Sequence, residues 1–401
     1  LDIATNNFQE AVKIDGVNVT VVDAGAIELG TSTVTGTYAV TATAGGDITN
    51  IGVLTITGAA TFKAASSQSI YLNESNTFSS TVAFTTPSGN LANVTVRDTT
   101  NFDLVALTLS GDLVVTSTGG SITDDGVLAI SGTSSFTTSA NNKFITLDVT
   151  TNAFTRAVTL NTTGSLGHAE IDGGTTQLII AASTVGGDLE LTSGNATGIT
   201  DSGTVTVNGN LIVINDVSNG DINMGSLAVD GTIALVTTGS GGDVTVVNDA
   251  GLDFVSSSIG GDLTATATSG NISDSGTLTV TGATNIYLGT NPILSVSGAT
   301  SATDINGNTI TLNISVFTGG ITLHYDNVLP PDDNSDIYLA SQVAFAELLF
   351  SIDQNITKIY GSYEETQDHL LWMYKLFRDS FPMQEQFLEV DRQPQPNQVK
   401  L

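Results

Sequence analysis

Two pairs of carboxylates at i,i+2 spacing are the first candidates for catalysis: Glu170 with Asp172, and Asp188 with Glu190. On a β-strand this spacing places both carboxylates of a pair on the same outward face. Paired carboxylates act as acid and base on glycosidic bonds, so either pair could do that chemistry. We prefer the alternative, solvated surface charge, because enzymes that cleave acidic sugars also need cationic side chains. Residues 1–325 contain only a few, widely scattered Lys and Arg side chains: Lys13, Lys63, Arg97, Lys143 and Arg156.

Four acidic residues at expected turns are candidate ligands of Ca²⁺, which prefers oxygen donors: Asp124, Asp125, Asp201 and Asp274. Asp124, Asp201 and Asp274 recur at a fixed interval along the chain. Carboxylates this far apart in a repeat protein lie several coils apart and cannot share an ion. We therefore expect them to form turns, since Asp closes a turn with its own side chain. We expect no cofactor, and Ca²⁺ is the one ion that we consider.

Signatures of other enzyme classes are absent from the sequence. The three histidines, His168, His324 and His369, are isolated, and neither a His-Glu-x-x-His nor a Gly-x-Ser-x-Gly motif occurs. The absence of Cys excludes disulfides and thiolate metal sites. We expect no catalytic residues and no enzymatic activity.

One stretch recurs four times along the chain, as Gly36–Gly58, Gly111–Gly132, Gly187–Gly209 and Gly261–Gly282. The first glycines of the copies show that the pattern returns at an almost constant interval, roughly 75 residues, which is typical of repeat architectures. In such architectures each unit packs only on its neighbours.

Apolar residues occupy the same positions in every copy, with Thr, Ser or Ala between them. This alternation predicts strands with one buried face. Between the strands an Asn or Asp stands two residues before a Gly, and both residue types suit a tight corner. Each copy is therefore predicted to be strand, corner, strand. The aligned apolar positions are Tyr38/Leu113/Leu189/Leu263, Val40/Val115/Leu191/Ala265, Ile48/Ile122/Ile199/Ile272, Leu54/Leu128/Val205/Leu278 and Ile56/Ile130/Val207/Val280.

The composition is that of an acidic β protein. The 401 residues include 42 Gly and only 12% charged residues, and the formal net charge is −30. Such a charge argues against nucleic acid and anionic membranes as partners, since both need a basic face. The sequence contains no run of about 18 apolar residues, so no transmembrane helix is predicted. The chain starts at Leu1 without a signal-type segment, which we interpret as a matured product or a fragment of a longer chain.

The predicted fold is all-β: a parallel β-helix, or β-solenoid, of four units of about 75 residues. Each unit would hold three or four coils of roughly 19–25 residues. Four small β domains in tandem are the alternative, but no Pro-rich or charged linker separates the units. The solenoid is expected to span residues 1–325.

A change in composition after residue 325 predicts a small helical segment at the C-terminal end. Residues 326–335 include Leu-Pro-Pro-Asp-Asp-Asn and are expected to be a linker, since paired prolines stop a strand ladder. Residues 336–382 are predicted to form a helical hairpin, with Ser-Tyr-Glu-Glu as a capping box for its second helix. Residues 383–401 are Gln/Pro-rich and are predicted to be an extended tail.

The repeated pattern G-D-L-x-[VLA]-T-[SA], followed by I-[ST]-[DN]-x-G-x-L-x-[IV]-x-G, resembles the strand repeats of filamentous-haemagglutinin-like proteins. This resemblance covers about residues 1–323 and implies a secreted bacterial adhesin or fibre at the cell surface. The family has no catalytic residues to transfer. From the resemblance we expect an extracellular structural protein, with adhesion to surface or matrix glycans as a further expectation. A carbohydrate-binding or carbohydrate-cleaving β-helix is the alternative.

The chain itself is the expected partner, in a head-to-tail homopolymer. Open strand edges at the ends of a solenoid pair with other chains unless they are covered. The repeat pattern begins almost at once, with Phe8, whereas the predicted helices could cover the C-terminal end. Aromatic residues dominate interface hot spots. The expected inter-subunit contacts are therefore Phe8, Trp372, Tyr374, Phe377 and Phe381.

Overall fold

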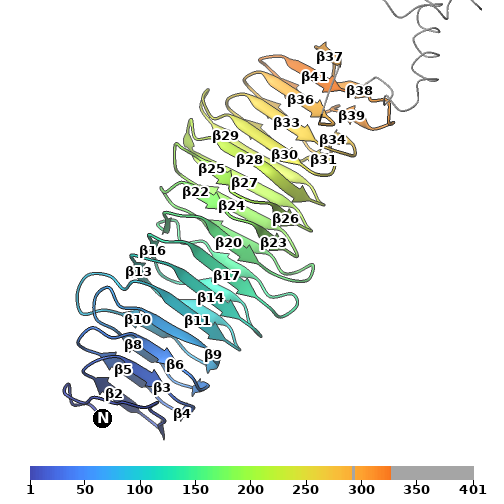
Figure 1. Ribbon diagram of the computed structural model, residues 1–401. Coiled ribbons are helices and arrows are strands. Elements are labelled where there is room, and N and C mark those ends of the chain that lie inside the picture. The colour runs from blue at the N-terminus through green and yellow to red at the C-terminus, as the bar shows by residue number, and fades with distance from the viewer. Residues whose placement is uncertain (291–293, 327–401) are drawn as a thin grey trace, which may run out of the picture. The chain divides into compact units, whose positions relative to one another are not determined.

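The computed structural model describes residues 1–290 and 294–326, and these form a parallel β-solenoid (Figure 1). The all-β prediction is confirmed for this part of the chain, which contains strands and no helix. The predicted linker, helical hairpin and tail (residues 326–335, 336–382 and 383–401) lie outside the described residues, except for Asp326.

Each coil contributes one segment to each of two stacks of parallel strands, which we name face 1 and face 2. Residues 107–109, 128–130 and 153–154 of face 2 pair among themselves as a separate three-stranded sheet. Face 1 consists of β3 (Ile27–Leu29), β4 (Ser32–Val34), β6 (Ile48–Asn50), β7 (Leu54–Ile56), β9 (Ile70–Phe78), β11 (Val94–Asp98), β14 (Leu113–Ser117), β17 (Ser134–Thr138), β20 (Val158–Asn161), β22 (Leu178–Ile180), β23 (Ser183–Val185), β25 (Ile199–Asp201), β26 (Val205–Val207), β28 (Ile222–Val229), β30 (Val244–Asn248), β33 (Leu263–Ala267), β36 (Thr284–Leu288) and β41 (Ile321–Tyr325). The short β1 (Asp15–Gly16) pairs with β4 at the start of this face.

Face 2 runs beside it along the same solenoid. It consists of β2 (Val19–Asp23), β5 (Tyr38–Ala42), β8 (Ala60–Lys63), β10 (Val82–Thr85), β12 (Phe102–Leu104), β13 (Leu107–Leu109), β15 (Ile122–Asp124), β16 (Leu128–Ile130), β18 (Ile145–Leu147), β19 (Ala153–Phe154), β21 (Ala169–Asp172), β24 (Leu189–Ser193), β27 (Leu211–Ser218), β29 (Ile233–Thr238), β31 (Leu252–Phe254), β32 (Ser257–Ile259), β34 (Ile272–Asp274), β35 (Leu278–Val280), β39 (Thr309–Thr311) and β40 (Val316–Phe317).

The length of a coil follows from the strand register. Asp15 pairs with Thr33 in one of the shortest coils, and Ile145 pairs with Ala169 in one of the longest. Since each coil stacks directly on the next, a repeat of about 75 residues contains about three and a half coils of this length. The prediction of three or four coils per unit is confirmed.

Alternation along the strands fills one continuous core. Every aligned apolar position of the four repeats is buried, with no more than 1% of its surface exposed, and belongs to a single hydrophobic cluster. Residues between them, such as Thr in β5 and β14, are only partly exposed because neighbouring coils flank them. The repeat alignment made from the sequence is therefore confirmed at each of its apolar positions.

Because each repeat contains about three and a half coils, the first strand of successive copies lies alternately on face 2 and on face 1. Tyr38 and Leu189 lie on face 2, whereas their counterparts Leu113 and Leu263 lie on face 1. In each copy the first half is one straight strand and the second half is two three-residue strands with a corner between them. The bent segment therefore alternates between face 1 and face 2 along the solenoid.

Residues after β36 depart from the repeat and cover the edge of the last coil. β37 (Leu294–Ser297) pairs antiparallel with β41, and β38 (Ser301–Thr303) pairs antiparallel with β39. Both strands belong to an insertion between the paired residues Thr284 and Ile321, which are farther apart in sequence than paired residues of the earlier coils. The edge of β41 that faces away from β36 is thus occupied by the chain's own β37.

Candidate functional site

The corner acids of the repeat join one coil to the next. Nδ2 of Asn152 donates to Oδ2 of Asp124 at 2.7 Å, and the amide of Asp148 donates to Oδ1 of Asp124 at 3.1 Å. In the first copy the equivalent bond runs from Nδ2 of Asn50 to Oδ1 of Asn76, at 2.8 Å. All three bonds join side chains of one coil to groups of the coil that follows it.

The third and fourth corner acids bind backbone amides of the following coil instead. Asp201 accepts from the amides of Gly225 and Ser226 at 3.0 and 2.6 Å, and Asp274 accepts from the amides of Asn313 and Ile314, both at 2.9 Å. Asp201 and Asp274 stand at corners, as predicted, but they bond the following coil and not their own turn. Their side chains point along the solenoid axis because the amides at the next corner lie there. Asn50, at the same position in the first copy, does bond its own corner, since its Nδ2 donates to the carbonyl of Gly52 at 3.1 Å.

Burial changes the ionisation of one of these acids. Asp124 is 6% exposed, and desolvation raises its pKa to about 6, against the hydrogen bond from Asn152 and with a further rise from the nearby Asp148 carboxylate. A carboxylate in this state is charged at neutral pH at a cost in folding free energy. The neighbouring Asp125 sits at the same corner, where its charge helps to raise the pKa of Asp103 after the larger effect of desolvation.

A second set of Asp and Asn side chains stands at the Gly-Asp and Gly-Asn corners, where each side chain accepts a hydrogen bond from a backbone amide of the next coil. Oδ1 of Asp112 accepts from the amide of Thr133 at 2.7 Å, Oδ1 of Asp188 from Asn210 at 2.7 Å, and Oδ1 of Asp262 from Ala283 at 2.7 Å. Carboxylates accept hydrogen bonds and donate none, so they suit exposed backbone amides. Much of the acidic composition is thus used to hold consecutive coils together.

The candidate catalytic carboxylates lie on face 2. Glu170 and Asp172 both point outward from β21, as predicted, and Glu190 of β24 is the direct neighbour of Glu170 across the strands. Desolvation, followed by the charges of Glu190, Asp148 and Asp172, raises the pKa of Glu170. Asp188 is separate from them: it lies at the corner before β24 and caps Asn210.

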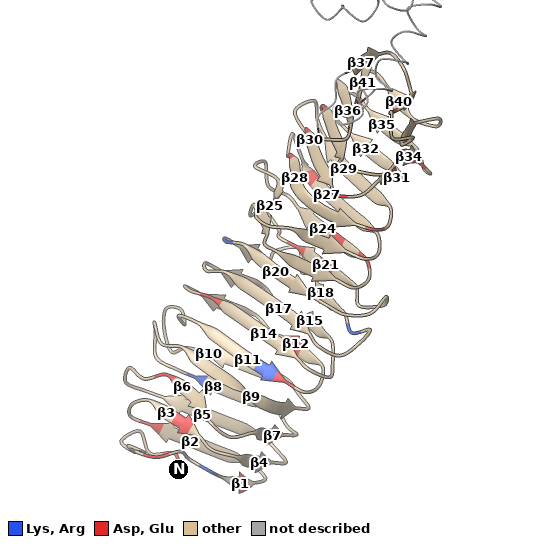
Figure 2. Cartoon of the chain, turned by 45° about the vertical axis from the view of Figure 1, so that its right-hand side comes forward, with Lys and Arg blue, Asp and Glu red and all other residues tan. Residues whose placement is uncertain are grey.

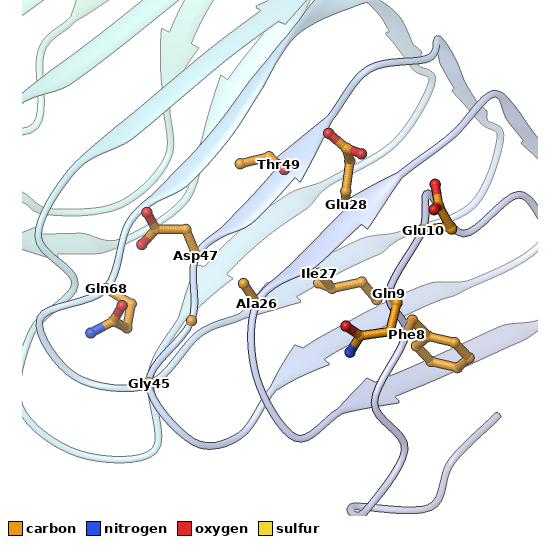
Figure 3. A pocket seen from close by; sticks show the side chains of 11 residues that line it. Phe8, Gln9, Glu10, Ala26, Ile27, Glu28, Gly45, Asp47, Thr49 and Gln68 are labelled. Atoms are coloured by element: carbon orange, nitrogen blue, oxygen red, sulfur yellow. The ribbon is translucent and has the colours of Figure 1, made fainter.

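A pocket of about 560 Å³ lies near the N-terminal end of the solenoid (Figure 3). Phe8, Gln9 and Glu10 lie along one side, and side chains of β3, β6 and the corners between coils line the rest. Gly45 leaves this corner hollow, since a Cβ atom there would meet nothing within 4 Å, and Glu28 and Asp47 lie on the rim. None of the paired carboxylates of β21 and β24 lines this pocket.

Phe8, an expected inter-subunit residue, is partly buried against the core, and its amide donates to Oδ2 of Asp23 at 2.7 Å. The other expected contacts, Trp372, Tyr374, Phe377 and Phe381, lie outside the described residues. Within residues 1–290 and 294–326 no group of three or more His, Asp or Glu side chains is placed to hold a metal ion. Across the same residues no helix is long and apolar enough to cross a bilayer.

The partners of the corner residues Asn50 and Asp124 were not predicted from the sequence. Asn76 and Asn152 are buried polar residues, and each makes a side-chain hydrogen bond that joins two coils. Asn76 accepts its bond from Asn50, and Asn152 donates its bond to Asp124. The two asparagines stand one repeat apart, and this spacing is the signal that could have found them. Their role depends on the register between coils, which the spacing alone does not reveal.

Comparison with known proteins finds a family of repeats whose function is unknown. Residues 16–85, 91–161 and 241–294 match a family model described as repeats of unknown function (DUF5649). The second segment starts one repeat after the first, and the third starts two repeats after the second. No curated protein and no solved structure matches the chain. Over these three segments, which together make just under half of its length, the chain is similar to a family defined by its repeats alone.

Proposed function

We propose that the chain is a structural extracellular protein whose solenoid builds a surface fibre or matrix. The observation that carries this proposal is the unbroken parallel pairing of coils from β1 to β36, continued by β39, β40 and β41. Such a ladder fixes the length and direction of the chain without needing a ligand. The use of corner acids as coil-to-coil clamps serves the same purpose, since these acids are engaged by backbone amides.

A bacterial, secreted, cell-surface origin is part of the proposal and rests on the sequence. The repeat resembles those of filamentous-haemagglutinin-like adhesins, and a Cys-free chain suits an oxidising environment without depending on disulfides. The net charge of −30 favours a well-hydrated surface over contact with nucleic acid. In this proposal the protein is an adhesin or fibre subunit of that kind.

Head-to-tail joining of subunits completes the proposal. The aromatic residues Trp372, Tyr374, Phe377 and Phe381 are proposed as the contacts that one subunit offers, and Phe8 as part of the surface that receives them. Head-to-tail contacts that do not close on themselves propagate as filaments. β37 already pairs with the outer edge of β41, so that edge is not available for strand pairing with another subunit. The proposed joining therefore uses the aromatic side chains.

Electron microscopy of the purified full chain tests this function. We expect unbranched filaments, and we expect that deleting residues 336–401 leaves monomeric rods with an unchanged β-type circular dichroism spectrum. A full chain that remains monomeric at high concentration and at physiological salt would contradict the filament proposal. A truncated chain that polymerises normally would exclude residues 336–401 as the connector.

A second candidate, binding or cleavage of carbohydrate, is favoured by the pocket beside Phe8. An aromatic ring next to amides and carboxylates (Gln9, Glu28, Asp47 and Gln68) offers stacking together with hydrogen bonds. Glycan arrays would detect binding, and reducing-end assays would detect cleavage. Binding lost in Phe8→Ala, or turnover lost in Glu170→Gln, would place this candidate above the structural one.

A further inference from the structure

Face 2 carries two outward columns whose chemistry changes abruptly halfway along. In the first column Glu170, Glu190, Ile212 and Ala234 follow one another in register on β21, β24, β27 and β29. In the second column the order on the same strands is Asp172, Thr192, Ile214 and Val236. All eight are partly exposed, and elsewhere on this face Thr, Ser and Ala predominate at outward positions.

The acidic half of this surface is short of positive charge. Glu170 and Glu190 are directly opposite on neighbouring strands, where like charges repel. Asp148 and Asp172 add to the negative potential at Glu170, and Asp216 adds to that at Asp172 (Figure 2 shows acidic residues in red). The pKa values of Glu170 and Asp172 are both raised, first by desolvation and then by these neighbours. A cation placed over this half would relieve the repulsion.

The apolar half lies directly beside it. Ile212 and Ile214 alternate with the buried Leu211 and Val213 on β27, so they face away from the core. Ala234 and Val236 do the same on β29 and lie next to them in register. Four apolar side chains thus form a patch that borders Glu190 and Thr192 in register, with Glu170 and Asp172 one rung farther on.

From this juxtaposition we propose that β21, β24, β27 and β29 form a docking surface for an amphipathic helix of a partner protein. The helix carries Lys or Arg at one end of its contact face and aliphatic side chains at the other. Charge complementarity argues for this occupant over a second copy of the chain, which carries a net charge of −30 and 10 Lys and Arg residues in all. The proposal concerns a side face of the solenoid and does not rest on filament formation.

The spacing of the rungs favours a helix along the solenoid axis. Neighbouring strands are about 4.8 Å apart, so four rungs extend over about 14 Å. About ten helical residues cover that distance at about 1.5 Å per residue, and side chains one turn apart fall close to successive rungs. Lys or Arg side chains in the first turns would then lie over Glu170 and Glu190, and aliphatic side chains in the last turns over Ile214 and Val236.

A synthetic helix-forming peptide tests the proposal. The probe is a fluorescein-labelled peptide of about five helical turns, a length at which an isolated helix can form in water. One face of this helix carries Lys in its first half and Leu in its second half. A control peptide has the same composition distributed evenly around the helix. Fluorescence anisotropy with the full chain should show that the probe binds more tightly than the control, and that its affinity falls as salt is raised.

Two double variants separate the halves of the surface. Glu170→Gln with Glu190→Gln removes charge at constant shape, and Ile214→Thr with Val236→Thr keeps β-branched side chains. Each should weaken binding of the probe at least tenfold. The matched controls are Glu28→Gln with Glu74→Gln and Val114→Thr with Val247→Thr, which alter acidic and outward apolar residues elsewhere. They should change the affinity less than twofold.

Because the chain has no Cys, a single Thr146→Cys variant can place an environment-sensitive dye one rung before Glu170. Binding of the probe should shift its emission, whereas the same dye at Thr116→Cys on face 1 should not respond. The proposal fails if the probe does not bind at millimolar concentration, or binds equally to both double variants and the unaltered chain. It also fails if only the charge variant matters and spermine competes as well as the probe, since the surface would then take small cations.

Discussion

The side-chain amide of Asn152 donates a 2.7 Å hydrogen bond to Oδ2 of Asp124, and so joins two consecutive coils at a corner of face 2. Oδ1 of Asn152 meanwhile accepts from the amide of Leu128, at 2.8 Å. The buried side-chain amide of Asn152 therefore supplies a donor for the carboxylate of Asp124 before the corner and an acceptor for the backbone amide of Leu128 after it. The first copy solves the same problem without a charge, since Asn76 accepts from both Asn50 and the amide of Leu54.

Stability should rise as pH falls from 7.5 to 5, because the folded state raises the pKa of Asp124 to about 6 from an ordinary value of 3.8. A carboxyl group of this kind contributes stability below its unfolded pKa and loses that contribution as pH rises through its folded pKa. Asp124→Asn should reduce the pH dependence of the free energy of unfolding by about 1–2 kcal/mol. Urea titrations at the two pH values measure this difference.

The reciprocal variant is Asn50→Asp, which puts a carboxylate at the equivalent corner of the first copy. It should increase the same pH dependence, because the site is buried and Oδ1 of Asn50 has no hydrogen-bond partner. If both variants leave the pH dependence unchanged, these corner residues do not titrate in this range.

The alternation of inward and outward residues predicts a sharp contrast between neighbours on β16. Leu128 is fully buried, whereas Ala129 points outward between coils. Leu128→Asp should cost several kcal/mol, as burial of an unpaired charge does, and Ala129→Asp should cost less than about 1 kcal/mol. Thermal unfolding followed by circular dichroism compares them. Equal melting temperatures for the two variants would show that the repeat alignment is wrong.

The fold could be predicted from the sequence because its determinants are local. Strand alternation and the recurring Gly corners sit within each copy, so the inward positions, from Tyr38 to Val280, were all predicted correctly. The placement of copies on alternate faces was not predicted. It follows from a coil length that does not divide the repeat evenly, and coil length is a property of register between strands.

The contacts of the site were harder to predict for the same reason. Asp124 has the sequence context of a local turn former, but its partners Asp148 and Asn152 belong to the next coil, and only the stacking of coils brings them together. The outward pairing of Glu170 with Asp172 was predicted from spacing, whereas the neighbouring Glu190 and Ile212 required the register. The antiparallel strands β37 and β38 fall in a stretch that was predicted as continuing solenoid, because the residue pattern of a strand does not show whether it pairs parallel or antiparallel.

The antiparallel cover on the last coil predicts a local loss of protection when it is disrupted. Val296 pairs with Leu323 in the middle of β37, and proline at that position removes an amide and restricts the backbone. Val296→Pro should speed hydrogen exchange in β41 while β14 and β17 keep the exchange rates of the unaltered chain. Hydrogen exchange with mass spectrometry measures both regions in one experiment. Unchanged exchange in β41 would show that β37 does not protect it.

The glycines at the Gly-Asp and Gly-Asn corners predict positions at which the coils cannot accept a side chain. Gly209 hydrogen-bonds to Gly187 in the coil before it and to Gly231 in the coil after it, at 3.1 and 3.0 Å. A Cβ atom at position 209 would lie 2.4 Å from Oδ1 of Asp188 and 2.6 Å from the carbonyl carbon of Gly187. Both distances are shorter than van der Waals contact, and the second involves backbone that cannot rotate away.

Gly209→Ala should therefore separate two coils and weaken the cap that Asp188 provides to Asn210. We expect a loss of about 1–3 kcal/mol, comparable to overpacking a core, seen as a melting temperature lower by several degrees. Gly225→Ala is the matched control, because a Cβ there meets nothing within 4 Å and its backbone is not in the left-handed region. That control should be neutral or slightly stabilising, since alanine restricts the unfolded chain. If Gly209→Ala melts at the same temperature as Gly225→Ala, the close approach of the coils at this corner is not what requires glycine.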